Sequence, residues 1–299
     1  MDLDEFIVAV YCLVDESIEE ILGGHRLRSR GPNPLLDDRE VITMEVVGEF
    51  LGIDTDEGIR RFFLGHYAQW FPALVWVHRT TFARQAANLW KIKEGLWRRL
   101  ALVDAPEESA LLVVDSFPVP ACRKARSYRC KLLWEVATHG YDELGKRFFY
   151  GVRVHLLVRW PGVVCGFKLA PANVHDLHPA RSLLQENASA RGWVLGDRNY
   201  HSPELAEGLA NRGLRLLTPH KVTKGERRPW PRWLVQRRRR IETVIGQLVG
   251  RYNAKKVWAR DSWHLRSRFL RKILSHTVAV LLCRRAGLGP LRFSELLTA

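Results

Sequence analysis

Two short apolar runs that each end in an aspartate decide the fold of this chain: LLVVD at residues 111–115 and GWVLGD at residues 192–197. Aspartate is a poor strand former, so its position directly after an apolar strand calls for a reason. In an open α/β sheet, functional side chains collect at the carboxyl ends of the strands. We therefore expect Asp115 and Asp197 to lie at one edge of a sheet, although each could instead cap the turn that follows it.

The segments around these runs alternate as in an α/β sheet flanked by helices, and not as in a β-barrel. The expected elements are strands over 149–160, 163–169 and 214–217, and helices over 179–190, 202–213, 233–252 and 265–282. Residues 116–147 contain two prolines and seven Lys or Arg residues, and we expect them to form a loop or an insertion.

The first hundred residues are expected to be helical, because apolar side chains recur there at helix spacing and Asp or Thr residues stand at helix starts. A boundary is expected at Ala105–Glu108, which gives a helical N-terminal domain over 1–105 and a second domain over 106–299. The helical domain could read DNA as a helix-turn-helix. It could equally be a small bundle that packs on its neighbour.

The positive charge of the chain is concentrated in one segment. The 299 residues include 47 Lys and Arg against 32 Asp and Glu, for a formal net charge of +15. Between Lys221 and Lys272 there are 17 Lys or Arg residues and only three acids. Clustered charge of this kind, at a pI near 10.0, indicates a polyanion-binding protein. A solvated basic face is the simpler alternative.

Other compositional features exclude several classes of protein. No uncharged apolar stretch of about 18 residues occurs, so no membrane span is expected. The acidic N-terminus is not typical of a signal peptide. The five cysteines form no C-x-x-C pair, which argues against a disulfide scaffold or a zinc ribbon and favours a reducing cytosol.

A third carboxylate, Glu242, stands alone in the basic segment. On a helix it shares a stripe with Arg238, Ile245 and Val249, which suggests that it faces the sheet and the two aspartates. Ion pairing with Arg238 or Arg239 is the simpler interpretation. Three carboxylates would suit Mg²⁺ or Mn²⁺, and two such ions about 4 Å apart can activate a hydroxyl and stabilise the leaving oxygen of a phosphodiester.

Five motifs, in order, resemble those of bacterial insertion-sequence DDE transposases. VVDS at 113–116, GDRNY at 196–200 and RRIET at 239–243 look like the three acidic motifs of that family. FYGVRVHLLV at 149–158 resembles the strand after the first aspartate, and ANVHD at 172–176 resembles the loop after the hairpin. The resemblance covers about residues 110–282.

The resemblance implies an RNase H-like mixed sheet flanked by helices and preceded by a small helical domain. It implies an enzyme that cleaves DNA at the element ends and joins the freed 3′-hydroxyl to target DNA. Asp115, Asp197 and Glu242 would be its catalytic residues and would hold two Mg²⁺ ions, with Mn²⁺ as a substitute. Its partners would be terminal inverted repeats and target DNA, bound by a homodimer in the bacterial cytoplasm at the nucleoid.

Further residues are candidates for binding DNA or for supporting the metal ligands. The basic residues expected to contact DNA are Lys221, Lys224, Arg237, Arg238, Arg239, Arg240, Arg251, Lys255 and Lys256. His155, His175 and Asp176 are candidates for positions beside the metal ligands. His155 could instead be a core residue, and His175 with Asp176 could stabilise a turn.

The chain departs from one subgroup of the family, whose members carry a Tyr before the Arg of the third motif and a Lys after its Glu. Val235 and Val249 stand at those positions here, with Arg251 or Lys255 as alternatives to the Lys. Two other functions stay open. An RNase H-like nuclease without strand transfer needs the same site, and a non-catalytic DNA-binding relative needs only the basic surface. The presence of all three acids favours an enzyme.

Overall fold

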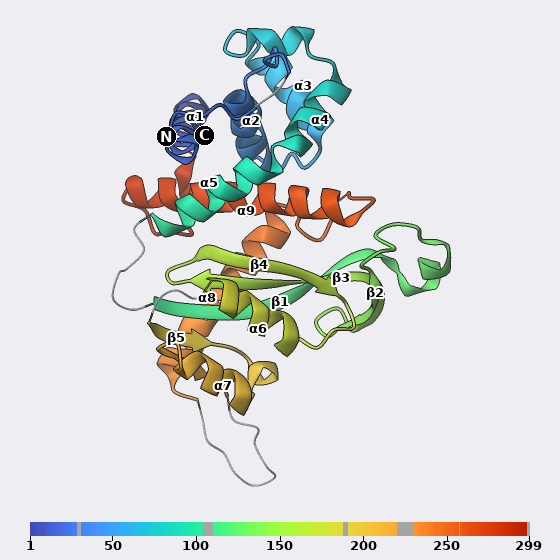
Figure 1. Ribbon diagram of the computed structural model, residues 1–299, viewed down its shortest axis with the longest axis vertical. Coiled ribbons are helices and arrows are strands. Elements are labelled where there is room, and N and C mark those ends of the chain that lie inside the picture. Colours follow the sequence, from blue (N-terminus) through green and yellow to red (C-terminus); the bar gives the residue numbers. More distant parts are fainter. Residues whose placement is uncertain (29–30, 104–109, 188–190, 220–229, 257, 298–299) are drawn as a thin grey trace. The chain divides into compact units, whose positions relative to one another are not determined.

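The computed structural model describes residues 1–28, 31–103, 110–187, 191–219, 230–256 and 258–297 (Figure 1). The chain forms two compact units. The helical unit consists of Met1–Val103, Gln247–Val257 and Trp263–Ala299, and the sheet unit consists of Asp104–Gly246 and Trp258–Ser262. Within the described residues, no helix is long and apolar enough to cross a membrane.

The helical unit contains most of the helices of the chain. Its elements are α1 (Leu3–Leu22), α2 (Asp38–Phe50), α3 (Asp56–His66), η1 (Pro72–Trp76), α4 (Arg79–Asn88), α5 (Trp90–Leu102), nearly all of α9 (Ser262–Arg285) and α10 (Phe293–Leu296). Side chains cap several of these helices as their sequences indicate. Asp2 and Asp37 each form a capping box with a glutamate three residues on, and Gly23 ends α1 in the left-handed conformation.

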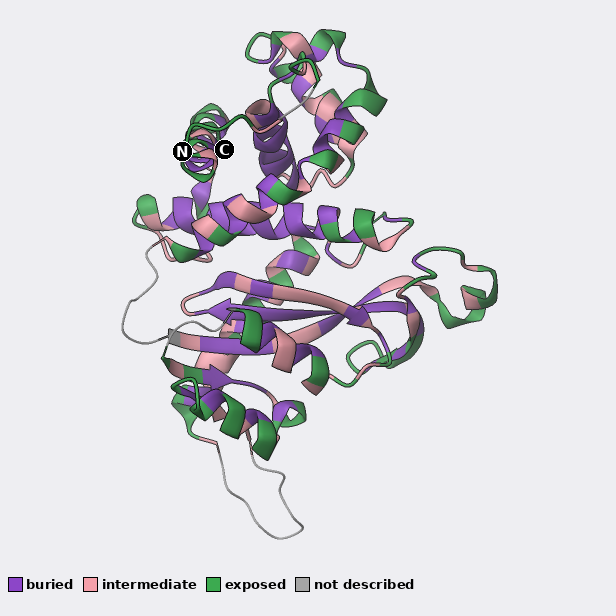
Figure 2. Ribbon diagram, viewed as in Figure 1, coloured by how far each residue is buried: buried purple, intermediate pink, exposed green. Residues whose placement is uncertain are grey.

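Two helices of this unit are buried on nearly every side. In α2 every residue from Val41 to Phe50 is buried, and in α9 so is every residue from Phe269 to Cys283 (Figure 2). Helices buried all round are expected to be apolar throughout, yet these carry charged side chains. Glu45 and Glu49 on α2 therefore require cations within the core, which α5 and α9 supply.

The sheet unit is built on six strands: β1 (Ala110–Arg123), β2 (Thr138–Asp142), β3 (Arg147–Arg159), β4 (Val163–Pro171), β5 (Gly192–Leu195) and β6 (Leu214–Leu217). Their order is β2-β3-β1-β5-β6, with β4 also paired to β3. β3 runs antiparallel to β1, β2 and β4, whereas β5 runs parallel to β1 and β6. The sheet is thus mixed, and the expected α/β fold with a preceding helical region is confirmed.

Helices α6 (Leu177–Asn187) and α7 (Pro203–Ala210) pack on this sheet, and α8 (Arg232–Gly250) follows β6. A core cluster joins Leu112, Val114 and Val194 of the sheet to Leu183 of α6 and Leu205 of α7. These sheet residues alternate with Val113 and Leu195, so successive side chains of β1 and β5 point to opposite faces. The helices α6 and α7 therefore cover one face only.

The structure corrects the expectation for residues 116–147. β1 continues to Arg123, a short 3₁₀ helix η2 (Lys124–Arg129) follows, and β2 adds a further strand. The prolines did not prevent this, because β5 pairs only with residues 110–113 of β1, so that among the described strands Pro118 and Pro120 have a partner on one side alone, and the ladder with β3 shifts just after Pro120.

The helical segment from Arg79 to Leu102 is interrupted at Leu89, where α4 ends and α5 begins. The Nζ of Lys93 donates to the carbonyl oxygen of Ala86 at 2.8 Å, which satisfies a backbone group near the break. The boundary expected at Ala105–Glu108 lies outside the described residues. Most of α9, which the sequence assigned to the second domain, clusters with the N-terminal helices.

Candidate active site

Two aspartates neighbour each other where the parallel pairing of β1 and β5 ends. Val113 pairs with Leu195 in this ladder, and Asp115 and Asp197 each follow two residues later. Because side chains along a strand alternate with a period of two, both carboxylates lie on one face of the sheet. Asp115 itself lies within β1, opposite Leu156 of β3, and not at the strand end that the sequence suggested.

The electrostatic surroundings of these two side chains disfavour negative charge. Burial raises the pKa of Asp115 to about 7, and the nearby Asp197 and Asp176 add to the rise. Opposing it are Arg238 and a 2.8 Å hydrogen bond from the Ser116 backbone N–H. Burial also raises the pKa of Asp197, where Asp176 again adds and Arg238 opposes. Carboxylates gathered with so little compensating charge favour a bound cation.

Asp176 is a third carboxylate near this pair, on the loop before α6. Its Oδ1 accepts a 3.1 Å hydrogen bond from the Ser116 hydroxyl, and Arg153 Nη1 lies 3.6 Å from its Oδ2. His155 Nδ1 lies 3.8 Å from Asp176 Oδ1, and burial lowers the pKa of this histidine to about 4. His155 is therefore a neutral, buried strand residue next to Asp176. Ser116 and Arg153 were not singled out from the sequence, although both lie within the quoted motifs.

His175 is placed differently from its neighbour. Its Nδ1 accepts a 3.3 Å hydrogen bond from the backbone N–H of Leu177 at the start of α6. A side chain that accepts from a free N–H in this way caps the helix. The geometry thus corresponds to the turn-stabilising alternative considered from the sequence.

Glu242 lies on α8 and is bound by an arginine of the same helix. Arg238 Nη2 donates to Glu242 Oε1 at 3.0 Å, and half of the glutamate side chain is exposed (51%). The expected inward stripe of Ile245 and Val249 is wrong, because the buried positions of α8 are Leu234, Ile241, Val244 and Leu248. That register turns Glu242 away from the helix's packed face.

Arg238 nevertheless links the three acidic motifs. Its charge lowers the pKa of both Asp115 and Asp197, and its guanidinium binds Glu242. Among the described residues, no three His, Cys, Asp or Glu side chains are gathered closely enough to hold a metal ion. The structure thus brings the two aspartates together and pairs the glutamate with an arginine whose charge also acts on both aspartates.

Comparison with models of known protein families gives the family of this chain. The family model of a transposase DDE domain matches residues 106–257. The chain belongs to this transposase family. Among solved structures, a piggyBac transposase synaptic complex with hairpin DNA is similar with a TM-score of 0.47 and 11% identity, covering 99% of this chain and 79% of that one. A search of the curated proteins found no match.

The basic residues expected to contact DNA in this transposase have different surroundings in the structure. Arg237 and Arg240 stack on the ring of Trp160, with guanidinium carbons 4.0 and 4.8 Å from its centroid. Arg239 is exposed. Arg251 belongs to the helical unit, where its Nη1 donates to the carbonyl oxygen of Phe50 at 3.0 Å.

Of the remaining basic candidates, Lys255 is half-buried and Lys256 is exposed, both in the helical unit. Lys221 and Lys224 lie outside the described residues. The seven candidates that the structure describes are thus divided between the two units. Arg251 is already hydrogen-bonded to the backbone of Phe50, and Arg238 is paired with Glu242 in the candidate active site.

The second acidic motif of the transposase has a packing requirement that explains its glycine. A Cβ at Gly196 would lie 2.9 Å from the Cβ of Tyr200, closer than real Cβ atoms approach. Tyr200 is 1% exposed and belongs to the core cluster under α6 and α7. Asp197 between them caps the short helix η3 (Arg198–Tyr200) by accepting from the Asn199 N–H at 2.8 Å. The motif thus fixes the backbone that carries the aspartate.

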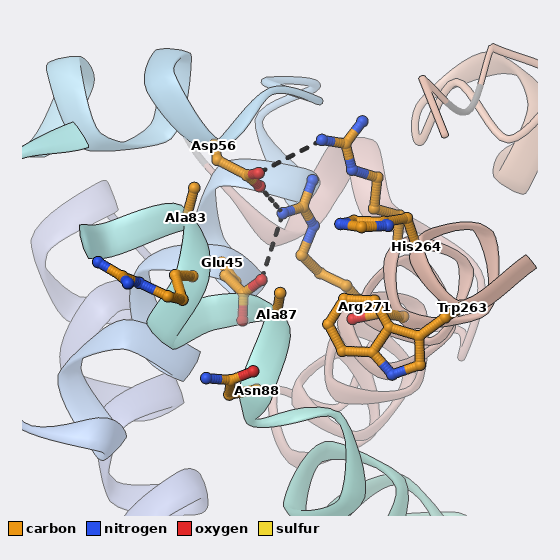
Figure 3. Close-up of a pocket in the computed structure, with 11 residues that line it drawn as sticks. Glu45, Asp56, Ala83, Ala87, Asn88, Trp263, His264 and Arg271 are labelled. Carbon is orange, nitrogen blue, oxygen red and sulfur yellow. Dashed lines mark hydrogen bonds and ion pairs between the residues drawn. The ribbon is translucent and has the colours of Figure 1, made fainter. Parts of the chain in front are cut away.

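A separate cavity of about 420 Å³ lies in the helical unit between α2, α4 and α9 (Figure 3). Arg271 contacts both Asp56 and Glu45 on its wall, and Trp263 and His264 lie on the same helix as Arg271, across from these acids. Arg271 Nη1 lies 2.5 Å from Asp56 and 3.2 Å from Glu45, so the charged groups there neutralise one another. None of the three acidic motifs contributes to this cavity.

Proposed function

We propose that this transposase cleaves DNA at the ends of a bacterial insertion sequence and joins the freed 3′-hydroxyl to target DNA. The observation that carries the proposal is the register of β1 and β5, which places Asp115 and Asp197 two residues beyond one ladder pair and on one face. Both residues lie within the segment that matches the transposase DDE domain. Neighbouring carboxylates on rigid strands are a suitable support for metal-dependent phosphodiester chemistry.

The donor chemistry fits a divalent cation. Asp115 and Asp197 would hold Mg²⁺, or Mn²⁺ in its place, through hard carboxylate oxygens. Glu242 would complete the set from α8, on condition that it exchanges Arg238 for the cation. Two bound ions would activate the attacking hydroxyl and stabilise the leaving oxygen.

The surrounding residues would position the substrate and the ligands. Released from Glu242, Arg238 would be free to pair with a DNA phosphate beside the two aspartates. Arg153 and Ser116 hold Asp176 in place, and Asp176 lies close to both proposed catalytic aspartates. Exposed cations such as Arg239 and Lys256 would bind the DNA backbone, which gives affinity that falls with salt.

Two DNA ends must be held together for transposition, so we also propose a homodimer on DNA. Terminal inverted repeats and target DNA are its proposed partners, and the bacterial nucleoid in the cytoplasm is its proposed location. A sedimentation measurement with and without end DNA tests the dimer. A complex that stays at one protein chain per DNA end would contradict it.

The catalytic proposal is tested with purified protein, supercoiled DNA carrying the terminal repeats, and Mg²⁺ or Mn²⁺. Asp115→Asn, Asp197→Asn and Glu242→Gln should each lose cleavage and joining while keeping the wild-type melting temperature. Glu204→Gln is the matched control, because Glu204 is an exposed acid of α7 that pairs only with a surface arginine among the described residues (side chain 80% exposed).

Each outcome discriminates between functions. Variants that cut and join as well as the wild type would show that the triad assignment is wrong. A wild-type protein that nicks any duplex and never joins ends would be a nuclease of the same fold. Binding without any cleavage in either metal would favour the non-catalytic alternative.

A further inference from the structure

Beyond the end of β1 the sheet unit carries a group of exposed aromatic side chains. We define residues 123–148, from the end of β1 through β2 to the start of β3, as the aromatic lobe. Tyr128 is 77% exposed, Trp134 is 72% exposed and Phe148 is 56% exposed. Large aromatic side chains are normally buried in a soluble protein, and a group of exposed ones marks an interaction surface.

The backbone that presents these rings is anchored to the rest of the sheet unit. Leu133, next to Trp134, is 3% exposed, and its N–H donates to the carbonyl oxygen of Arg260 at 2.8 Å. The Ser127 hydroxyl donates to the carbonyl oxygen of Lys124 at 2.7 Å, which stabilises the 3₁₀ turn that carries Tyr128. The exposed rings therefore stand on an ordered platform, and binding would not require the chain to fold first.

The lobe carries a net positive charge, with seven Lys or Arg residues against the three acids Glu135, Asp142 and Glu143. Residues 123–134 contain five Lys or Arg residues and no acid: Arg123, Lys124, Arg126, Arg129 and Lys131. All five are exposed, and none forms an ion pair within the part of the chain that the structure describes. Lys124 Nζ lies 4.6 Å from the centroid of the Phe148 ring, and the Arg129 guanidinium lies 5.1 Å from that of Tyr128. Cations thus lie beside two of the exposed rings of the lobe.

β1 connects this lobe directly to the candidate active site. Asp115 and Arg123 belong to the same strand, eight residues apart. At about 3.3 Å per residue, the lobe begins roughly 26 Å along β1 from Asp115. A DNA strand leaving the active site along β1 would reach the lobe.

We propose that the aromatic lobe binds an unpaired DNA strand, with bases stacked on Trp134 and Tyr128 and phosphates bound by the five cations. The proposal rests on the proposed function in one respect, namely that the polyanion is DNA. A duplex hides the faces of its bases and would need only the cations, whereas exposed rings among cations match unpaired bases and their phosphates. The excess of seven Lys or Arg residues over three acids favours a polyanion over an ordinary protein partner, whose surface carries both signs more evenly.

The test is equilibrium binding of the full chain to a fluorescein-labelled 12-nucleotide thymidine oligomer, measured by fluorescence anisotropy in EDTA. Trp134→Ala should weaken binding by about 5- to 100-fold, as expected for the loss of one stacked base. Trp134→Phe should restore most of the affinity, because it keeps a ring. Trp76→Ala is the matched control, since Trp76 is 80% exposed on η1 in the helical unit and should leave binding unchanged.

Salt dependence separates stacking from charge. Replacing Arg129 and Lys131 by Ala should lower the slope of log affinity against log salt by about 0.7 for each lost phosphate contact, whereas Trp134→Ala should leave the slope unchanged. Binding to a duplex of equal length should not respond to Trp134→Ala.

Three results would overturn the proposal: Trp134→Ala binding the oligomer as tightly as the wild type, losing affinity for duplex to the same extent, or changing the sedimentation coefficient of the protein instead of its affinity. The last would assign the lobe to a protein interface. The binding assay contains no divalent ion and requires no cleavage, so it is independent of the plasmid cleavage test. A negative binding result would not contradict the proposed cleavage, and a negative cleavage result would not contradict binding of the oligomer by the lobe.

Discussion

The buried ion network of the helical unit gives the sharpest prediction about stability. Glu49 on α2 is 0% exposed and accepts from two cations of α9, Arg271 Nε at 2.6 Å and Lys272 Nζ at 2.8 Å. Arg271 has further partners in Glu45 and Asp56, so it would stay compensated without Glu49. Lys272 has no other ion pair within the described residues.

Glu49→Gln keeps the shape of the side chain and removes its charge. Lys272 would then hold a buried ammonium group without an anion, and breaking a buried pair in this way costs about 3–5 kcal/mol. The free energy of unfolding of an ordinary domain is about 5–15 kcal/mol, so this loss would be a large part of the total stability. Urea unfolding followed by circular dichroism would measure it as a shift in midpoint at constant slope.

Two further variants isolate the cause. Glu295→Gln removes an exposed glutamate that pairs with Arg292 on the surface, and it should change stability by less than about 1 kcal/mol. Adding Lys272→Met to Glu49→Gln removes the uncompensated charge and should recover most of the loss. A double variant no more stable than Glu49→Gln would refute the reasoning, because the loss would then not come from the unpaired lysine.

The pH dependence of Glu49→Gln follows from the same lysine. Burial already lowers the pKa of Lys272, and Glu49 opposes that shift. Without Glu49 the folded-state pKa falls further below its unfolded value of about 10.4. The unfolded chain then binds more protons, so the stability of the variant should rise as pH increases toward about 10. An equal deficit at pH 7 and pH 10 would contradict this.

Three other predictions concern single positions. Burial lowers the pKa of His276 to about 3, below its unfolded value of about 6.5. The free energy of unfolding should therefore fall by up to about 1.4 kcal/mol for each unit that the pH drops from about 6.5 toward 3. His276→Gln should remove this pH dependence from a series of urea-unfolding measurements. Gly196→Ala should destabilise by about 1–3 kcal/mol because its Cβ meets Tyr200, whereas Gly246→Ala on α8, with nothing within 4 Å, should stabilise slightly; thermal melting compares the two. Arg239→Ala should weaken duplex binding and lower the salt slope by about 0.9, measured by titration at several salt concentrations.

The two aspartates were predictable because their signal is local. Each follows an apolar run, and parallel strands bring their carboxyl ends to one edge, so a sequence pattern suffices to pair Asp115 with Asp197. The extension of β1 past Asp115 was not predictable in this way. Residues 116–123 are stabilised as a strand by pairing with β3, a long-range partner that no local pattern of prolines and cations reveals.

Glu242 shows a different limit. Helical periodicity gives the stripes of α8 but does not say which stripe is buried, since Ile241, Val244 and Leu248 form an apolar stripe as good as the one expected. The ion pair with Arg238 was an open alternative from the sequence, and the structure contains it. The effect of the Arg238 charge on both aspartates could be found only from the folded chain.

The basic segment shows why charge along a sequence is not charge at a surface. Seventeen Lys or Arg residues between Lys221 and Lys272 suggested one continuous wall for DNA. In the structure Arg271 and Lys272 are buried and paired with acids of α2 and α3, more than 200 residues away in sequence. The count of charges over residues 221–272 did not include these acids, because they lie outside that segment. The charge available to DNA must therefore be sought among exposed, unpaired cations, and residues 123–134, which the sequence marked only as an insertion, supply five of them.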